Sequence, residues 1–255
     1  MLVIANGAFK SGSTWLFNIV RCMTGFPGIP EAYQNPGWDD PSIAPDKLRE
    51  LLARLDLAGR DYLVKNHFGK RRQRDLILAH EHVRVLNIRR DLRDVVVSAY
   101  YYHRQKSGYR GDFKAYYREM GRSVADHVRR YHALWDVADA RVYTSSYEAL
   151  KSDFRAEAQR VGRFLGLALS GEEVEHIREE TSLQALRDKY GEADKPSEER
   201  FFRKGAVGQW TEYFDEAMQR DIERIERWGL PYVTRGRLWL MRAVKGTFRG
   251  KKGLA

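Results

Sequence analysis

The chain has 255 residues, a formal net charge of +10 and a single cysteine, Cys22. One cysteine excludes an intrachain disulfide and is typical of a reducing compartment, and a chain of this length can bury a core without a disulfide or structural metal. Seven cations and no acid follow Trp228, which leaves +3 for the rest (10 − 7), so the charge does not indicate a nucleic-acid partner.

Short apolar segments predict strands, and helical patterns lie between them. The expected strands cover residues 2–5, 62–64, 83–88 and 141–144, and the expected helices cover residues 46–57, 113–137 and 154–165, with a capping box at Ser170-Gly-Glu-Glu173 that begins a further helix. This alternation predicts an α/β fold with a central parallel sheet flanked by helices. We expect a single domain over residues 1–227, with ligands at the carboxyl ends of its strands.

The first strand leads through a Gly/Ser/Thr turn into an amphipathic helix. Residues Gly7 to Thr14 nearly match the phosphate-binding P-loop, but Ser13 stands where that pattern has its lysine and Lys10 lies inside the loop. A helix N-terminus presents unpaired backbone N–H groups and a positive dipole, which bind phosphate. The sequence therefore predicts a phosphate-binding strand–turn–helix with an altered lysine position.

Basic and titratable residues follow the next two strands. Lys65 and His67 come after residues 62–64, and Arg89-Arg90 come after residue 88, where a magnesium-dependent phosphotransferase would need an aspartate. We therefore expect an anionic ligand bound without a metal ion. A histidine is a candidate general base, although a lone histidine is more often a surface or capping residue. Arg90 and Ser98, about two turns along the following helix, can together grip a phosphate monoester.

Two loops complete the expected site. Residues 25–45 are rich in Pro, Gly, Asn and Asp, which predicts an irregular loop that helps to shape a binding pocket. Residues 189–208 are charged and interrupted by glycine and proline, and we predict a mobile lid there.

Read together, these motifs resemble those of sulfotransferases that use 3′-phosphoadenosine 5′-phosphosulfate (PAPS). Phe9-Lys-Ser-Gly-Ser-Thr-Trp-Leu16 is similar to the family's 5′-phosphosulfate loop, Pro-Lys-Ser-Gly-Thr-Thr-Trp. Residues 85–98 resemble its 3′-phosphate segment, with Asp91 in place of an asparagine, and residues 202–210 resemble its Arg-Lys-Gly-(x)-(x)-Gly-(x)-Trp segment. The resemblance runs from residue 3 to about residue 214 and implies the sulfotransferase fold, which is similar to that of P-loop NTPases.

The resemblance implies a role for each candidate residue. The loop would bind the 5′-phosphosulfate. Arg90, Ser98 and residues 203–205 would bind the 3′-phosphate, and a set of aromatic and polar residues would contact the adenine. The implied cofactor-binding residues are Lys10, Ser11, Gly12, Ser13, Thr14, Trp15, Arg90, Ser98, Tyr147, Thr181, Leu183, Arg203, Lys204 and Gly205, and the implied catalytic residues are Lys10, His67 and Ser98. Leu183 replaces an aromatic residue of the family, so we expect Trp15 to supply most of the stacking on adenine.

The implied reaction is in-line transfer of a sulfuryl group from PAPS to an acceptor hydroxyl or amine, with PAP as product and no metal ion. His67 would remove the acceptor's proton and Lys10 would neutralise the leaving phosphate. The acceptor would be a small molecule, a glycan or a lipid. The alternatives are a nucleotide kinase or NTPase with a degenerate P-loop, which would need magnesium ligands, and a non-catalytic adenosine-phosphate binder, which would have no use for a base.

The last 28 residues, 228–255, interleave cations with apolar side chains. We expect this basic amphipathic tail to pack its apolar face on the domain, with contact to an anionic membrane surface as the alternative. A strand that begins at Leu2 leaves no room for a signal peptide, and no apolar run is long enough to span a membrane, so we expect a cytoplasmic protein.

Overall fold

The computed structural model describes residues 1–231, so the tail predicted over residues 228–255 lies almost entirely outside the described residues. The described chain forms two compact units. The first comprises residues 1–91 and 131–207, and the second comprises residues 92–130 and 208–231 of the described chain.

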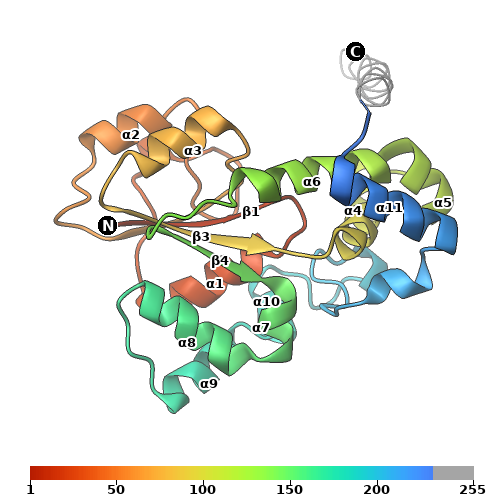
Figure 1. The fold of residues 1–255 in the computed structure, drawn as a ribbon. Helices are drawn as coiled ribbons and strands as arrows, with labels where there is room; N and C mark the ends of the chain where they lie inside the picture. Colours follow the sequence, from red (N-terminus) through yellow and green to blue (C-terminus); the bar gives the residue numbers. More distant parts are fainter. Residues whose placement is uncertain (232–255) are drawn as a thin grey trace, which may run out of the picture. The chain divides into compact units, whose positions relative to one another are not determined.

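All strands of the described chain lie in the first unit and form one parallel sheet in the order β2-β1-β3-β4 (Figure 1). They are β1 (Leu2–Gly7), β2 (Tyr62–Asn66), β3 (Val83–Arg89) and β4 (Val142–Ser146). Because β1 lies inside the sheet, both of its faces are buried, which explains its nearly continuous apolar sequence. The predicted α/β class with a central parallel sheet flanked by helices is confirmed.

Helices cover both faces of this sheet: Figure 1 shows α2 and α3 on one side and α1, α8 and α9 on the other. The helices and 3₁₀ turns of the first unit are α1 (Ser13–Thr24), η1 (Glu31–Tyr33), α2 (Leu48–Arg54), α3 (Arg71–Leu78), α7 (Tyr147–Ser152), α8 (Phe154–Phe164), α9 (Gly171–Glu180), α10 (Leu183–Lys189) and η3 (Ser197–Glu199). The predicted capping box begins α9, where Ser170 Oγ accepts a 3.1 Å hydrogen bond from the Glu173 amide and the Glu173 carboxylate accepts one of 2.7 Å from the Ser170 amide.

A single buried cluster joins the strands to the helices on one face. Its fully buried members include Val3 of β1, Phe17 of α1 and Val161 of α8, none of them more than 1% exposed. The apolar side of α1 therefore packs against the sheet. This packing positions the loop between β1 and α1, the phosphate-loop candidate, at the carboxyl ends of the strands.

All the regular secondary structure in the described part of the second unit is helical. It contains α4 (Leu92–Ser107), α5 (Phe113–Tyr116), a π-helical turn η2 (Tyr117–Gly121), most of α6 (Arg122–Leu134), η4 (Gln209–Glu212) and α11 (Glu216–Trp228). The single helix predicted over residues 113–137 is thus interrupted by the π turn and ends at Leu134. A Cβ on Gly121 would lie 3.0 Å from Val96, so the π turn brings this glycine close against α4.

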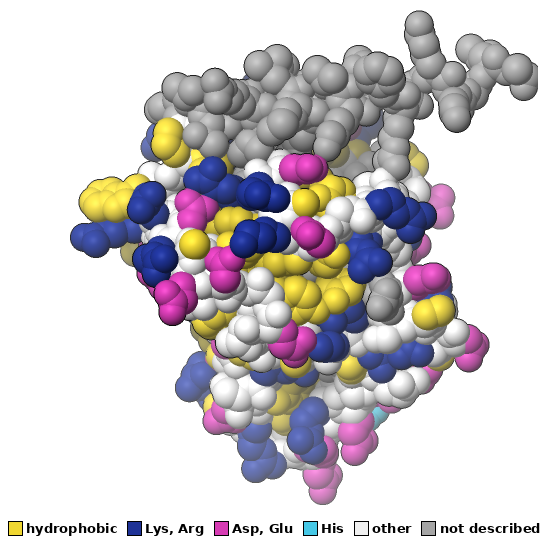
Figure 2. All heavy atoms as spheres, turned by 90° about the vertical axis from the view of Figure 1, so that its right-hand side faces the viewer, with side chains coloured by type: hydrophobic (Ala, Val, Ile, Leu, Met, Phe, Trp, Pro, Cys, Tyr) yellow, Lys and Arg dark blue, Asp and Glu magenta, His cyan; other side chains and the backbone are white. Residues whose placement is uncertain are grey.

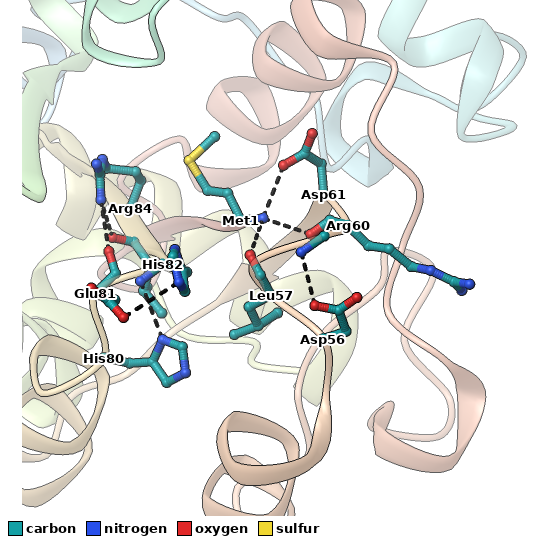
Figure 3. Close-up of polar contacts among 11 residues, drawn as sticks. Met1, Asp56, Leu57, Arg60, Asp61, His80, Glu81, His82 and Arg84 are labelled. Atoms are coloured by element: carbon teal, nitrogen blue, oxygen red, sulfur yellow. Dashed lines mark hydrogen bonds and ion pairs between the residues drawn. The ribbon is translucent and has the colours of Figure 1, made fainter.

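At the amino ends of the strands, polar contacts join neighbouring segments of the chain (Figure 3). The backbone nitrogen of Met1 donates to the carbonyl oxygens of Leu57 and Arg60, at 2.6 Å each, and lies 2.9 Å from the Asp61 carboxylate. His80 Nδ1 accepts a 3.3 Å hydrogen bond from the His82 amide. These contacts stabilise the connections at the amino ends of the strands, whereas the predicted site residues lie at the carboxyl ends.

Charges of both signs are interspersed around hydrophobic side chains on the face drawn in Figure 2, which agrees with a nearly balanced charge before residue 228. Within residues 1–231, no helix is long and apolar enough to cross a membrane.

Candidate active site

The loop between β1 and α1 presents an uncapped helix N-terminus. Gly12, the N-cap residue, has φ 97° and makes no side-chain capping hydrogen bond, and the first turn of α1 contains no acid. Lys10, with φ 63°, is the only non-glycine residue at positive φ among residues 1–231. The buried Ser11 Oγ has no hydrogen-bond partner within the described chain. This combination of unpaired donors is suited to an anion.

Glycine is required at two points of this loop. A Cβ on Gly7 would lie 2.7 Å from Ile88 Cγ2, and a Cβ on Gly12 would lie 2.7 Å from Cδ2 of the Tyr147 ring. The predicted loop and the predicted adenine-contacting Tyr147 are therefore in direct contact. Tyr147 is only 7% exposed and belongs to the buried cluster, so it also has a packing role.

Arg90, which follows β3, connects three of the predicted segments. Its Nη1 donates to the Lys10 carbonyl at 3.4 Å and its Nη2 donates to the Ala206 carbonyl at 3.2 Å. Its guanidinium carbon lies 4.1 Å from the centroid of the Tyr147 ring. The buried Nε has no partner within the described chain, so Arg90 still has a donor to offer an anion.

The Lys10 side chain turns into the protein, under an aromatic ring. Its Nζ lies 3.6 Å from the centroid of the Phe201 ring. Burial, together with the positive charges of Arg90 and Lys65, lowers the pKa of Lys10 to about 7, against the opposing effect of Glu192. This ammonium is therefore close to losing its proton at neutral pH, and an arriving anion would favour its charged form.

His67 follows the last residue of β2, is exposed, and is held to the phosphate loop by one hydrogen bond. Its Nδ1 lies 2.6 Å from the carbonyl oxygen of Gly7. A carbonyl oxygen only accepts, so Nδ1 must carry the proton, and in the neutral ring Nε2 then holds the lone pair. This is the tautomer that a general base requires.

Three buried side chains that the sequence did not predict as site residues, those of Asn6, Tyr131 and Trp135, position the chain around His67. Asn6 Oδ1 accepts hydrogen bonds from the Phe68 amide at 3.1 Å and from the Tyr131 hydroxyl at 2.5 Å. The Phe68 carbonyl in turn accepts a 2.7 Å hydrogen bond from the Trp135 indole. Both sides of the Phe68 backbone are thus fixed by buried groups, directly beside the candidate base.

A buried polar network connects Lys65 to α1, and it was also missed. Lys65 Nζ donates to Thr14 Oγ1 at 3.1 Å and is ion-paired with Asp40. Asp40 accepts a 2.6 Å hydrogen bond from the Tyr190 hydroxyl, which accepts one of 2.9 Å from Asn18. Asp40 is only 3% exposed. The loop over residues 25–45 therefore contributes a buried counter-ion to the site.

Residues 202–210, the predicted clamp segment that resembles the family's Arg-Lys-Gly-(x)-(x)-Gly-(x)-Trp motif, are anchored by two charged side chains. The Glu192 carboxylate accepts hydrogen bonds from the amides of Phe201 and Phe202, at 3.1 and 3.0 Å. Arg187 donates to the Phe202 carbonyl at 3.0 Å and to the carbonyl of Arg203. These bonds set the path of the backbone into Arg203, Lys204 and Gly205, the three predicted phosphate contacts.

The remaining candidates in the first unit are Leu183, Thr181 and Trp15. Gly205 has φ 60°, and a Cβ there would lie 3.3 Å from Leu183, so these two predicted residues are neighbours. The buried Thr181 hydroxyl donates 2.7 Å to the Ile177 carbonyl, so its predicted hydrogen bond to adenine stays a prediction. Half-buried Trp15 meets the Tyr147 ring edge-on, at 5.3 Å between centroids.

Ser98 belongs to the second unit, on α4, so its predicted phosphate contact beside Arg90 and its implied catalytic role stay predictions. In that unit the Asp94 carboxylate accepts hydrogen bonds from the amides of Gly208 and Trp210, at 2.8 and 3.1 Å. The Arg93 guanidinium lies 3.7 Å from the Trp210 ring centroid. The end of the predicted clamp segment is thus fixed to the first turns of α4. No group of three His, Cys, Asp or Glu side chains suited to a metal occurs among residues 1–231.

The sequence of the chain matches a known protein family. The family described as "Sulfotransferase domain" matches residues 3–228. Sulfotransferase 1E1 of Cavia porcellus is 25% identical over 238 residues, which cover 84% of this chain and 78% of the relative. The 3-beta-hydroxysteroid sulfotransferase of the same species is 26% identical over 235 residues, covering 85% and 79%. Human sulfotransferase 6B1 is 32% identical over only 77 residues, 30% of this chain and 25% of that protein.

Among solved structures, that of mouse sulfotransferase SULT7A1 complexed with PAP is similar with a TM-score of 0.66 and 19% identity, covering 92% of this chain and 86% of that one. The structure of a retinol dehydratase in complex with androsterone and PAP is similar with a TM-score of 0.63 and 20% identity. The match covers 91% of this chain and 82% of that one. These likenesses confirm the fold, and the family match supports the sulfotransferase prediction over the kinase alternative. The chain belongs to the sulfotransferase domain family and is a sulfotransferase.

Proposed function

We propose that the protein transfers the sulfuryl group of PAPS to an acceptor hydroxyl or amine, with His67 as general base and Lys10 stabilising the leaving phosphate. The observation that carries this proposal is the 2.6 Å contact between His67 Nδ1 and the Gly7 carbonyl. It fixes the basic tautomer and attaches the base to the loop that would bind the phosphosulfate. A base and an anion site in such close connection serve group transfer better than binding alone.

The donor site would be formed by three regions of the first unit. The amides of residues 11–15 would bind the 5′-phosphosulfate. The 3′-phosphate would be bound by Arg90, Arg203, Lys204 and Gly205. The unpartnered Ser11 Oγ and Arg90 Nε support this assignment, since both are buried donors without a partner in the described chain. The solved sulfotransferase SULT7A1 and the retinol dehydratase hold PAP, the product that PAPS would leave.

In the proposed step, His67 Nε2 takes the acceptor's proton as the acceptor oxygen forms its bond to sulfur. The bond from sulfur to the bridging phosphate oxygen breaks, and its electron pair stays on that oxygen. Lys10 then neutralises the new charge, assisted by the loop amides. The protein thus contributes mainly position and charge stabilisation, as in phosphoryl transfer.

The acceptor is proposed to be a hydroxylated small molecule, glycan or lipid. Structures of retinol dehydratase hold androsterone or retinol, both with a hydroxyl on an apolar frame. The cytoplasmic location and the role of the tail remain predictions from the sequence.

Calorimetric titration with PAP, set against ATP with magnesium, tests the donor assignment. We expect metal-independent PAP binding that Arg90→Ala and Arg203→Ala weaken by ~10-fold or more each, because each loses charge-assisted hydrogen bonds to phosphate. Arg178→Ala, an exposed cation paired with Glu175 on α9, is the matched control. Preference for ATP with magnesium would contradict the proposal.

A further inference from the structure

Five polar residues form a closed ring of contacts beside the first turn of α1, and of these only Thr14 belongs to the predicted donor site. Lys65 Nζ donates to Thr14 Oγ1 at 3.1 Å and is ion-paired with Asp40. The Tyr190 hydroxyl donates to Asp40 Oδ1 at 2.6 Å and accepts from Asn18 Nδ2 at 2.9 Å. Asn18 Nδ2 also donates to the Thr14 carbonyl at 2.7 Å, which closes the ring.

The ring joins segments that are far apart in the sequence, all of them in the first unit. Its members are Thr14 and Asn18 on α1, Asp40 between η1 and α2, Lys65 in β2, and Tyr190 directly after α10. The Asp40 side chain is 3% exposed and the Lys65 side chain 11%. Separating two such charges would leave both buried and unpaired, so the pair holds the Lys65 ammonium in one place.

This arrangement decides how the Thr14 hydroxyl can be used. An ammonium group has donors and no acceptor, so Thr14 Oγ1 must accept the hydrogen bond from Lys65. The hydrogen of the hydroxyl takes no part in that bond, and no other hydrogen bond of Oγ1 occurs among the described residues. Thr14 is only 8% exposed. A buried hydroxyl with an unused hydrogen is suited to donate to a ligand.

The neighbours of Thr14 indicate that this ligand is an anion. Thr14 is the second residue of α1, whose N-terminus has no side-chain cap at Gly12 and no acid in its first turn. The Ser11 Oγ nearby in the loop is a further buried donor without a partner in the described chain. A hydroxyl that accepts from an ammonium is polarised, which makes its own O–H a stronger donor.

We propose that Asp40 and Tyr190 are positioning residues for the donor nucleotide, acting through Lys65 on the Thr14 hydroxyl. Asp40 holds the Lys65 ammonium against Thr14 Oγ1, and the Thr14 O–H then donates to the 5′-phosphate. Tyr190 fixes the second oxygen of Asp40. This inference rests on the proposed function and names the residues that orient one donor of that same site. The loop over residues 25–45 thereby contributes to donor binding.

Two nucleotides isolate the contacts to the 5′-phosphate. PAP and adenosine 3′-phosphate differ only in that group, so the ratio of their affinities, measured by calorimetry, reports on it alone. Thr14→Val keeps the shape of the side chain and removes the hydroxyl. We expect it to lower the ratio ~10-fold or more, because a hydrogen bond to a charged group is lost. Thr14→Ser, which keeps the hydroxyl, should retain most of the ratio.

Variants of the positioning residues should act on the same ratio. Asp40→Asn should lower it ~10-fold, with recovery in Asp40→Glu, and Tyr190→Phe should lower it ~3-fold through the loss of one hydrogen bond. Tyr190→Phe leaves the ion pair in place, so it tests the inference even where Asp40→Asn does not fold. Tyr143→Phe is the matched control, since its hydroxyl donates at 2.9 Å to the buried Glu157 carboxylate. The affinity for adenosine 3′-phosphate should be unchanged throughout, which a general loss of structure would not allow.

A double variant shows whether Lys65 acts through Thr14. Lys65→Met should lower the ratio in the wild-type background and should have no further effect in Thr14→Val. Additive effects would overturn the inference, because Lys65 would then act on the phosphate directly. A ratio unchanged in Thr14→Val, or Tyr190→Phe behaving like Tyr143→Phe, would also overturn it. Failure to bind PAP at all would contradict the proposed function itself, whereas PAP binding that is indifferent to these variants removes only this inference.

Discussion

The aromatic ring of Phe201 covers the ammonium group of Lys10, with the Nζ 3.6 Å from the ring centroid. Phe201 is held there through its own amide, which donates to the Glu192 carboxylate at 3.1 Å. The loop lysine is therefore covered by the residue that directly precedes the segment 202–210, which resembles the family's Arg-Lys-Gly-(x)-(x)-Gly-(x)-Trp segment. This relationship connects the donor site to the protonation of Lys10.

PAP binding should take up a proton at pH 8. The pKa of Lys10 is lowered to about 7 by burial and neighbouring positive charge, so at pH 8 this lysine is ~90% neutral before the anion arrives. The bound phosphates raise that pKa, so the bound state carries more protons and the affinity falls as pH rises above about 7. Calorimetry in buffers of different ionisation enthalpy counts the protons. Lys10→Ala should abolish the uptake, and uptake unchanged in that variant would contradict the assignment.

Asp40→Asn should destabilise the fold. The change leaves the Lys65 ammonium, whose side chain is 11% exposed, without its counter-ion, at a cost of ~3–5 kcal/mol in the free energy of unfolding. Lys65→Met should also be destabilising because it leaves the Asp40 carboxylate buried and unpaired. Urea denaturation of both single variants and the double variant measures the coupling, which we expect to be at least ~1 kcal/mol. Additive effects would show that the two side chains do not depend on each other.

Gly12→Ala should weaken PAP binding and stability together. The added Cβ would lie 2.7 Å from the Tyr147 ring, at a residue with φ 97°. Gly166→Ala is the matched control, because its φ is 80° but no atom lies within 4 Å of the new Cβ. Both variants have backbone strain of ~1 kcal/mol, and only Gly12→Ala adds the clash, which we expect to cost a further ~1–3 kcal/mol. Equal thermal stability of the two variants would contradict the close packing of loop and ring.

The strand ends of the site could be predicted from the sequence because their chemistry is local. The loop around Lys10 and the residues after β2 and β3 each form a continuous motif, and parallel strands bring their carboxyl ends together. The sequence therefore predicts His67 and Arg90 as site residues, and in the structure both contact the loop between β1 and α1. The π turn at Tyr117–Gly121 was not, since the apolar pattern through it remains helical.

The supporting residues could not be predicted, because their partners are far away in the chain. Asp40 lies 25 residues from Lys65 and 150 from Tyr190, in a loop without periodicity. Asn6 lies within an apolar strand, and only the fold shows that its side chain meets Tyr131, 125 residues later. Such long-range polar pairs have no signature in a single sequence.

The most direct test of the account is the turnover number of His67→Ala, measured with PAPS and any accepted hydroxyl compound, beside the PAP affinity of the same variant. The account predicts that kcat falls at least ~10²-fold while PAP binds as tightly as before, because the variant loses the base and keeps the phosphate loop. His67→Gln should restore the contact to Gly7 without restoring kcat. Full activity in His67→Ala would contradict the assignment of His67 as the general base.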